Sequence, residues 1–249
     1  MFAHDRVCDL ASLARLRSAL PIRISWSVLF LKAYGLVAAE HSVLRRCYLK
    51  WPWPHLYEHP HSVATLVISR PLAGEDRLFW ARFTSPETQS LVHLQRTLDQ
   101  RYLGEPVESR FRRQILISRL PTPLRRMLWW TTLNLSGQKR AKRLGTFGLT
   151  TLAGEGAEIR RPPSPITTTL SYGPLDESGR MRVTIAYDHR VMDGLEIARA
   201  LSRLEQVLLG PIAQEAQGLC EPRAVTPTQH NPDAPSKATR PSTLARASA

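Results

Sequence analysis

A histidine and an aspartate stand four positions apart in the segment YDHRVMDGLEIARAL, residues 187–201. The residues before His189 favour a β-strand and those after Asp193 have helical spacing, so the histidine is expected at a strand end. Imidazole titrates near neutrality and suits removal of a proton from a thiol, hydroxyl or amine. Asp193 can cap the helix or pair with an arginine, and Gly194 permits a close backbone approach. The segment predicts a general base, with an incidental surface histidine as the alternative.

Three segments, in the same order, resemble the catalytic domain of dihydrolipoamide acyltransferases, the core components of 2-oxo acid dehydrogenase complexes. DHRVMDG at 188–194 resembles the family's D-H-R-x-x-D-G segment, and also the H-x-x-x-D-G signature of CoA-dependent acyltransferases. GTFGLTTL at 145–152 is similar to its G-T-F-T-[IV]-S-[NS]-L strand, and FLKAYGLV at 30–37 to its F-[LV]-[VI]-K-A-x-x-x-A helix. The correspondence covers about 22–50 and 145–209.

The resemblance implies direct acyl transfer between a thioester and an acceptor, without a covalent acyl-enzyme. His189 would be the general base on the attacking group. Asp193 would hold its loop, through an arginine for which Arg6, Arg15 and Arg17 are candidates. CoA or acyl-CoA would be the substrate, with no permanently bound cofactor, and the acceptor stays open.

The family's oxyanion donor is a serine of the G-T-F strand, and Thr150 stands at that position here. A threonine hydroxyl can still donate a hydrogen bond to an oxyanion. Thr151 would take the role if the register shifted by one residue, because strand neighbours face opposite sides. Arg190, Gly194 and Thr151 are predicted to contact the substrate or CoA.

The chain also departs from the family. No lipoyl domain or subunit-binding module is visible ahead of the catalytic part, and residues 158–165 replace a loop that shapes substrate access. By resemblance we expect a homotrimer with each site at a subunit boundary. The alternative is a non-catalytic scaffold relative of the same fold, possibly associated with a membrane surface.

Strand and helix patterns mix without strict alternation, which predicts an α/β (α+β) sandwich with a mixed β-sheet and flanking helices. The resemblance implies that this sandwich is chloramphenicol acetyltransferase-like. Helices are expected at 10–20, 25–40, 85–102 and 194–209. The last of them has an apolar stripe of Leu195, Ala198, Leu201, Leu204 and Leu208. A hairpin is expected over 63–83, and strands at 145–152, 166–172 and 181–187. Residues 1–215 would form the catalytic domain, and the Pro/Ser/Thr-rich residues 221–249 a disordered tail.

Residues 110–143 form a divergent basic segment that carries Trp129 and Trp130. It could lie on a membrane surface, steer CoA phosphates through the basic cluster at 139–143, or pack its tryptophans on the core. His55, His59 and His61 stand near Glu58, but prolines interrupt them and no second ligand cluster follows, so no metal site is predicted.

The net charge of +13 comes mostly from arginine, and it makes an anionic partner plausible. No motif that reads nucleic acid is present, and nucleic-acid binding is not expected. Three widely separated cysteines, in no ligand spacing, argue against a disulfide framework or a zinc site. Together with the missing secretory signal, they predict a cytoplasmic protein.

Overall fold

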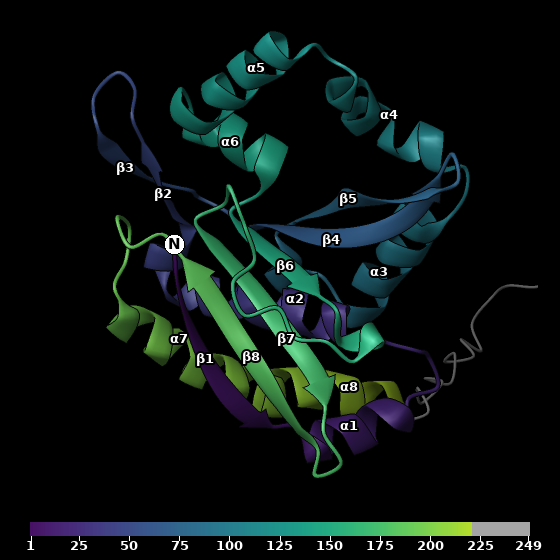
Figure 1. The fold of residues 1–249 in the computed structure, drawn as a ribbon. Helices are drawn as coiled ribbons and strands as arrows, with labels where there is room; N and C mark the ends of the chain where they lie inside the picture. Colours follow the sequence, from purple (N-terminus) through teal and green to yellow (C-terminus); the bar gives the residue numbers. More distant parts are fainter. Residues whose placement is uncertain (221–249) are drawn as a thin grey trace, which may run out of the picture.

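A six-stranded mixed sheet forms the centre of the computed structural model, which describes residues 1–220 (Figure 1). The strand order is β1-β8-β7-β6-β4-β5, in which β6 is parallel to both β4 and β7 and the other pairs are antiparallel. The strands are β1 (Phe2–Asp9), β4 (Val63–Leu72), β5 (Glu75–Thr84), β6 (Phe147–Thr151), β7 (Thr168–Leu175) and β8 (Arg180–Tyr187). A separate hairpin pairs β2 (Arg46–Leu49) with β3 (His55–Glu58). The predicted mixed sheet with flanking helices is confirmed.

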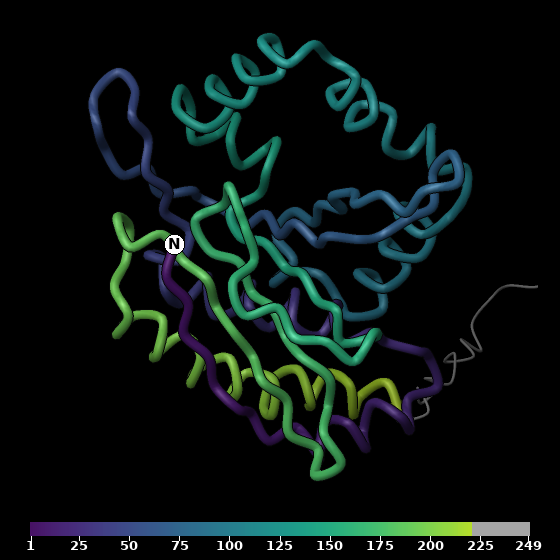
Figure 2. Tube along the Cα trace, viewed as in Figure 1, coloured from purple at the N-terminus to yellow at the C-terminus, as the bar shows by residue number. Residues whose placement is uncertain are grey.

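Helices cover one face of this sheet, and a second group surrounds its β5 edge (Figure 1). The first group is α1 (Ala11–Ser18), α2 (Trp26–Glu40), α3 (Leu91–Arg96), α7 (Gly194–Val207) and α8 (Ala213–Cys220). The second is α4 (Val107–Ser118), α5 (Thr122–Asn134) and α6 (Gly137–Leu144). The tube in Figure 2 shows the second group as an arc at the end of the sheet away from β1 and α7. None of the helices in residues 1–220 is long and apolar enough to span a membrane.

The two faces of the sheet differ in chemistry. In β6, Phe147 and Leu149 are fully buried against the helices, and Phe147 packs on Tyr34 of α2 at 4.5 Å between ring centroids. The alternate residues Gly148 and Thr150 lie on the opposite face, because successive side chains of a strand alternate. Register places Ser171 and Thr184 beside Thr150 on that second face. The helical face therefore forms the core, and the other face presents small hydroxyl-bearing side chains.

Helix α2 passes through the centre of the core. The Ser25 hydroxyl accepts a hydrogen bond from the Val28 amide and caps the helix, as its position before a long apolar run predicts. Ten of the fifteen residues of α2 are buried, including Lys32, whose ammonium pairs with Glu215 of α8. The apolar stretch is thus a core helix, as expected from its length.

Two local expectations were wrong, and two elements were not predicted. The helix expected from residue 85 begins only at Leu91, behind Ser90, because Ser85 has a left-handed φ of 46°. Of the apolar stripe predicted for 194–209, Leu201, Leu204 and Leu208 are buried, but Leu195 is 58% exposed and Ala198 is exposed, because the first turns of α7 direct Ile197 and Ala200 to the core. Strand β1 and the β2–β3 hairpin were not predicted. The expected tail, 221–249, lies outside the described residues.

Candidate active site

The segment around His189 is a short loop between strand β8 and helix α7. Strand pairing continues to Asp188, whose amide donates to the Thr167 carbonyl at 2.9 Å. The Asp188 carbonyl then accepts from the Val191 amide at 2.9 Å, which closes a turn. Val191 and Met192 are buried and anchor the loop to the core. The loop thereby fixes the backbone at His189, at the strand end that the sequence predicts.

The His189 side chain itself is exposed. Its ring lies edge-on to Phe2 at 5.0 Å between centroids and 6.0 Å from Tyr187. Among the described residues the imidazole makes no hydrogen bond, so both ring nitrogens are available to a substrate. Phe2 is 59% exposed, and the pair presents an aromatic surface rather than a closed pocket.

Asp193 caps helix α7. Its Oδ1 accepts from the amides of Leu195 at 3.0 Å and Glu196 at 3.1 Å. In residues 1–220 Asp193 forms no ion pair with an arginine. Of the three candidates, Arg6 binds Glu205 at 2.7 Å, Arg17 donates to the Ile24 carbonyl at 2.6 Å, and Arg15 forms no ion pair there. The arginine contact expected of Asp193 is therefore absent from residues 1–220. Asp193 instead has the other role that the sequence left open, which is to cap helix α7.

Gly194 is the first residue of α7, where it passes closely against strand β1. A Cβ built there would lie 3.0 Å from His4 Cε1 and 3.1 Å from its Nε2. A close backbone approach, as expected of this glycine, is what the structure shows. Its predicted contact with CoA stays a prediction.

Arg190 has partners within its own chain. Its guanidinium binds both carboxylate oxygens of Asp188, with Nη2 2.6 Å from Oδ2 and Nε 2.9 Å from Oδ1. Its Cζ also lies 4.5 Å from the ring centroid of Tyr48, on β2. Burial raises the pKa of Asp188, but hydrogen bonds and charge from Arg190 lower it by more. Arg190 therefore ties the His189 loop to the β2–β3 hairpin, a role the sequence did not suggest, and its predicted CoA contact stays a prediction.

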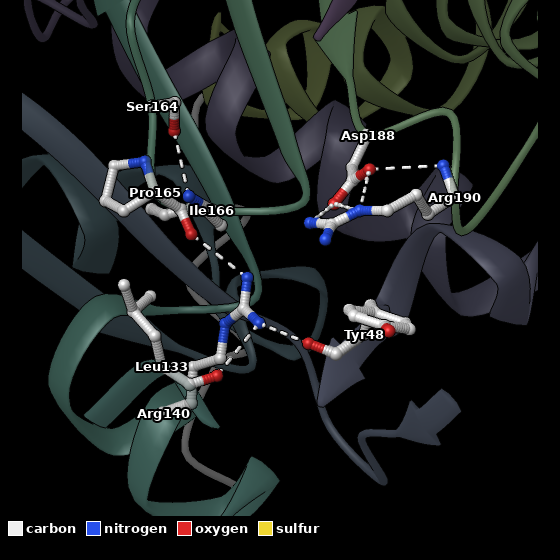
Figure 3. A network of polar contacts seen from close by, with 8 residues as sticks. All are labelled: Tyr48, Leu133, Arg140, Ser164, Pro165, Ile166, Asp188 and Arg190. Carbon is white, nitrogen blue, oxygen red and sulfur yellow. Dashed lines mark hydrogen bonds and ion pairs between the residues drawn. The ribbon is translucent and has the colours of Figure 1, made fainter. Parts of the chain in front are cut away.

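Arg140 of helix α6 continues this network to two more segments (Figure 3). Its guanidinium donates to the carbonyls of Tyr48 at 2.9 Å, Pro165 at 3.0 Å and Leu133 at 3.4 Å. The side chain is buried, and this burial lowers the pKa of Arg140. Since Pro165 precedes β7, one arginine connects the β2–β3 hairpin, the C-terminal end of α5 and the segment that leads into β7.

Thr150 and Thr151 have different environments. The Thr151 hydroxyl donates to the Tyr172 carbonyl at 2.8 Å and accepts from the Ala153 amide at 3.0 Å, on the core face of the sheet. Thr150 lies on the opposite, hydroxyl-rich face, is half-buried, and makes no side-chain hydrogen bond to a described residue. Of these two threonines, Thr150 is the one whose hydroxyl has no partner among residues 1–220 and can donate to a ligand.

One chain does not bring His189 and Thr150 together. The register aligns Tyr187 of β8 with Thr168 of β7 and with Phe147 of β6. From that row, Asp188 lies one residue toward one end of the sheet, and Thr150 lies three residues toward the other end. They are thus four residues apart along the strands and two strands apart across the sheet, which corresponds to about 16 Å between their Cα atoms. His189 lies one residue further. Two groups so far apart do not reach the same carbonyl.

The remaining sequence features have structural explanations. Trp129 packs edge-on against Trp80 of β5 at 5.7 Å between centroids, which favours the packing interpretation for this residue, whereas Trp130 is 50% exposed. His59 is buried, and burial lowers its pKa to about 4. Within residues 1–220 no group of three histidine, cysteine or acidic side chains could hold a metal ion.

Comparison with solved structures places this arrangement in a known fold. The chain is similar to a dihydrolipoamide acetyltransferase from Azotobacter vinelandii, with a TM-score of 0.62 and 16% identity over 85% of this chain and 82% of that one. The fold is that of a dihydrolipoamide acetyltransferase core. A cubic core of a pyruvate dehydrogenase complex gives a TM-score of 0.61 at 16% identity, again over 85% and 82% of the two chains. A probable dihydrolipoamide acetyltransferase from Listeria monocytogenes gives 0.60 at 15%, over 84% and 83%. At the level of sequence, no family profile and no curated protein matches the chain.

The sequence analysis missed the contacts that brace the His189 loop. Asp188 and Arg190 are two positions apart in DHR, so their pairing was visible as a charge pattern. Tyr48 and Arg140 are distant in the chain, and no local pattern marks either of them. Only tertiary packing shows that they meet at the His189 loop.

Proposed function

We propose that the chain is a CoA-dependent acyltransferase with His189 as its general base. The observation that carries the proposal is the presentation of His189: a strand end and a braced loop fix its backbone, while its imidazole is exposed and free of internal hydrogen bonds. The solved structure from Azotobacter vinelandii concerns a serine, a histidine and an asparagine in catalysis, the last two spaced four apart as are His189 and Asp193.

In the proposed reaction, His189 takes the proton of the acceptor thiol, hydroxyl or amine as that group attacks the acyl thioester carbon. The carbonyl π electrons move to oxygen, and the Thr150 hydroxyl donates a hydrogen bond to the resulting oxyanion. When the oxyanion collapses, the bond from carbon to the CoA sulfur breaks. His189 then returns its proton to that sulfur, so that acyl acceptor and free CoA leave with all atoms balanced.

We further propose that the site forms between two chains of a homotrimer. The separation of about 16 Å within one chain, estimated from strand geometry, is too large for His189 and Thr150 to act on one carbonyl. A neighbouring chain related by rotation can bring its own Thr150 to His189. One similar structure is a cubic core, and a cube has threefold axes through its corners. Two exposed apolar side chains beside the loop, Phe2 and Leu195, supply surface for such a contact.

The first experiment is calorimetric titration with CoA and acetyl-CoA at two salt concentrations, followed by acetyl transfer to dihydrolipoamide. Saturable binding that survives moderate salt is expected, because a formed site is screened less than surface charge. His189→Ala should lower transfer about 10²–10⁴-fold. His93→Ala, an exposed histidine on α3, is the matched control and should leave transfer unchanged. Transfer by His189→Ala within about threefold of the unmodified protein contradicts the base assignment.

A second candidate function is a non-catalytic assembly role at a membrane surface. The observation that favours it is a set of exposed apolar side chains among the arginines of α4 and α5, namely Leu116, Leu124, Met127 and Trp130. Apolar and cationic groups on one surface favour anionic lipid. Flotation with phosphatidylglycerol vesicles at low salt tests it, and protein left at the bottom of the gradient contradicts it.

A further inference from the structure

A cavity of about 570 Å³ lies between the edge strand β5 and helices α4 and α5, at the opposite edge of the sheet from β1. Its apolar lining comprises Leu72, Leu78, Phe79, Trp80, Phe111, Ile115, Ile117, Leu128, Trp129 and Leu144. The volume is within the range of pockets that hold small organic ligands. Four strand spacings, about 19 Å, separate β5 from β8, which carries His189. Within one chain the cavity is therefore not part of the His189 loop.

Specific contacts hold the walls of this cavity in place. Phe111 of α4 stacks on Phe79 at 4.4 Å, and Trp129 of α5 packs edge-on against Trp80. Gln114 binds the backbone of the edge strand with both ends of its amide: its Oε1 accepts from the Trp80 amide at 3.0 Å, and its Nε2 donates to the Trp80 carbonyl at 2.9 Å. These contacts fix α4 and α5 on either side of β5, so the space between the helices is built into the fold.

The charges around the cavity have one sign. Its polar lining includes six arginines, Arg77, Arg82, Arg110, Arg113, Arg125 and Arg143, and no acidic residue. Most of these guanidiniums bind neutral groups: Arg82 donates to carbonyls of 142 and 143, Arg143 to the Thr132 hydroxyl at 2.6 Å, and Arg125 to the Ser118 carbonyl at 3.3 Å. Among residues 1–220, Arg77 alone of the six has an acidic partner, Glu75.

Arg113 makes no hydrogen bond or ion pair with a described residue, although it lines the cavity. Positive charges that surround a low-dielectric space raise the local concentration of anions. A guanidinium also matches carboxylate and phosphate groups with paired donors. An apolar floor with a cationic rim is therefore complementary to a ligand that has an apolar chain and an anionic end.

We propose that this cavity binds a single molecule of an amphipathic anion, as opposed to a micelle or a membrane surface. The ligand has an unbranched acyl chain that ends in a carboxylate or similar acidic group. The chain lies against Phe111, Leu128 and Trp129, and the anionic end meets Arg113 and Arg125. The apolar lining distinguishes this ligand from free phosphate, and the uncompensated arginines distinguish it from a neutral lipid. The inference does not rest on the acyltransferase proposal, because the cavity is complete in one chain.

Titration calorimetry with dodecanoate, well below its micelle concentration, tests the proposal on the full chain. One saturable site per chain is expected. Dodecanol should bind at least about tenfold more weakly, because it lacks the charge-assisted contact. Sodium sulfate should also bind at least about tenfold more weakly, because it has no apolar chain to bury. Arg113→Glu and Arg125→Glu should each weaken dodecanoate binding by about tenfold or more. The matched controls are Arg112→Glu and Arg126→Glu, which make the same charge change on the same helices outside the lining.

The location has an independent readout. Trp80 and Trp129 line the cavity, whereas the other four tryptophans do not. A bromine at the end of the chain, in 12-bromododecanoate, should quench their fluorescence, and Trp129→Phe should reduce the quenched fraction.

Four results would overturn the proposal. They are absence of saturable binding, equal losses in the control variants, dodecanol or sulfate binding as tightly as dodecanoate, and association with anionic vesicles without binding of monomeric dodecanoate.

Discussion

Arg140 connects three segments through buried hydrogen bonds, and replacing it should destabilise the fold measurably. Arg140→Met keeps an apolar stem of similar length but removes every donor to the carbonyls of Tyr48, Pro165 and Leu133. Lys139→Met is the matched control, one residue away on α6 and exposed.

The magnitude follows from two of those contacts. The bonds to Tyr48 and Pro165 are 2.9 and 3.0 Å long, and a hydrogen bond to a charged donor contributes about 1.5 kcal/mol at the low end. The 3.4 Å contact to Leu133 adds little. The two bonds together contribute about 3 kcal/mol. Burial of the charged guanidinium opposes this gain, as the lowered pKa of Arg140 shows, and the variant no longer has that cost. Water can also reach the Pro165 carbonyl, because that residue is exposed. The expected net loss is about 2 kcal/mol.

Urea unfolding of the two variants measures this loss. Arg140→Met should lower the unfolding free energy by about 2 kcal/mol, which corresponds to about 4–8 °C in Tm for a chain of this size. Amide exchange should accelerate in 46–49 and 188–193, the segments that Tyr48 and Arg190 join. A loss no larger than that of Lys139→Met, or unchanged exchange in both segments, would refute the bracing role of Arg140.

Three further outcomes are expected. Gly145→Ala should lower the free energy of unfolding in urea by about 2 kcal/mol or more. The φ of Gly145 is +89°, and a Cβ there would lie 2.7 Å from the Val63 carbonyl oxygen. An unchanged free energy of unfolding would contradict the need for this close approach. Asp193→Ala should cost about 1 kcal/mol by thermal unfolding and Asp193→Asn much less, because an oxygen that can accept from the amides of Leu195 and Glu196 is retained only in the second variant; equal losses would point to a charge contact instead. The Asp188 pKa is depressed in the fold, so its stabilisation is present above its unfolded pKa and lost as pH falls through the folded pKa. The stability difference between the unmodified protein and Asp188→Asn should accordingly be constant above about pH 5 and shrink below about pH 4, and a difference that grows on acidification has the wrong sign.

Much of the fold was predictable because its strongest signals are local. The apolar run after Ser25, the hairpin with its turn at Ala73 and Gly74, and the strand–loop–helix around His189 each follow from spacing and capping. Strand β1 was missed because it is an edge strand with mostly exposed side chains, so apolar alternation is absent. The predicted apolar stripe of α7 began at Leu195, but the first turn of the helix leaves this side chain on the surface.

The candidate site was predictable only where resemblance or chemistry marked a residue. His189, Asp193 and the two threonines came from motifs, and strand alternation anticipated that one threonine alone would face a ligand. The sequence left two roles open for Asp193, helix capping and pairing with an arginine, and only the three-dimensional structure distinguishes them. Tyr48 and Arg140 were out of reach, because an arginine that binds distant carbonyls has no pattern in the sequence around it.

The central claim is that one transfer site combines His189 of one chain with Thr150 of another, and subunit complementation tests it most directly. Thr150→Ala should first be shown to lower acetyl transfer, with Thr150→Ser as the conservative variant that retains it. His189→Ala and Thr150→Ala chains are then unfolded together in equal amounts, refolded, and assayed for acetyl transfer to dihydrolipoamide. In a cyclic trimer about one quarter of the sites unite an intact His189 with an intact Thr150, so about one quarter of the original activity should return. Activity no greater than the mean of the two separate variants would contradict a site shared between chains.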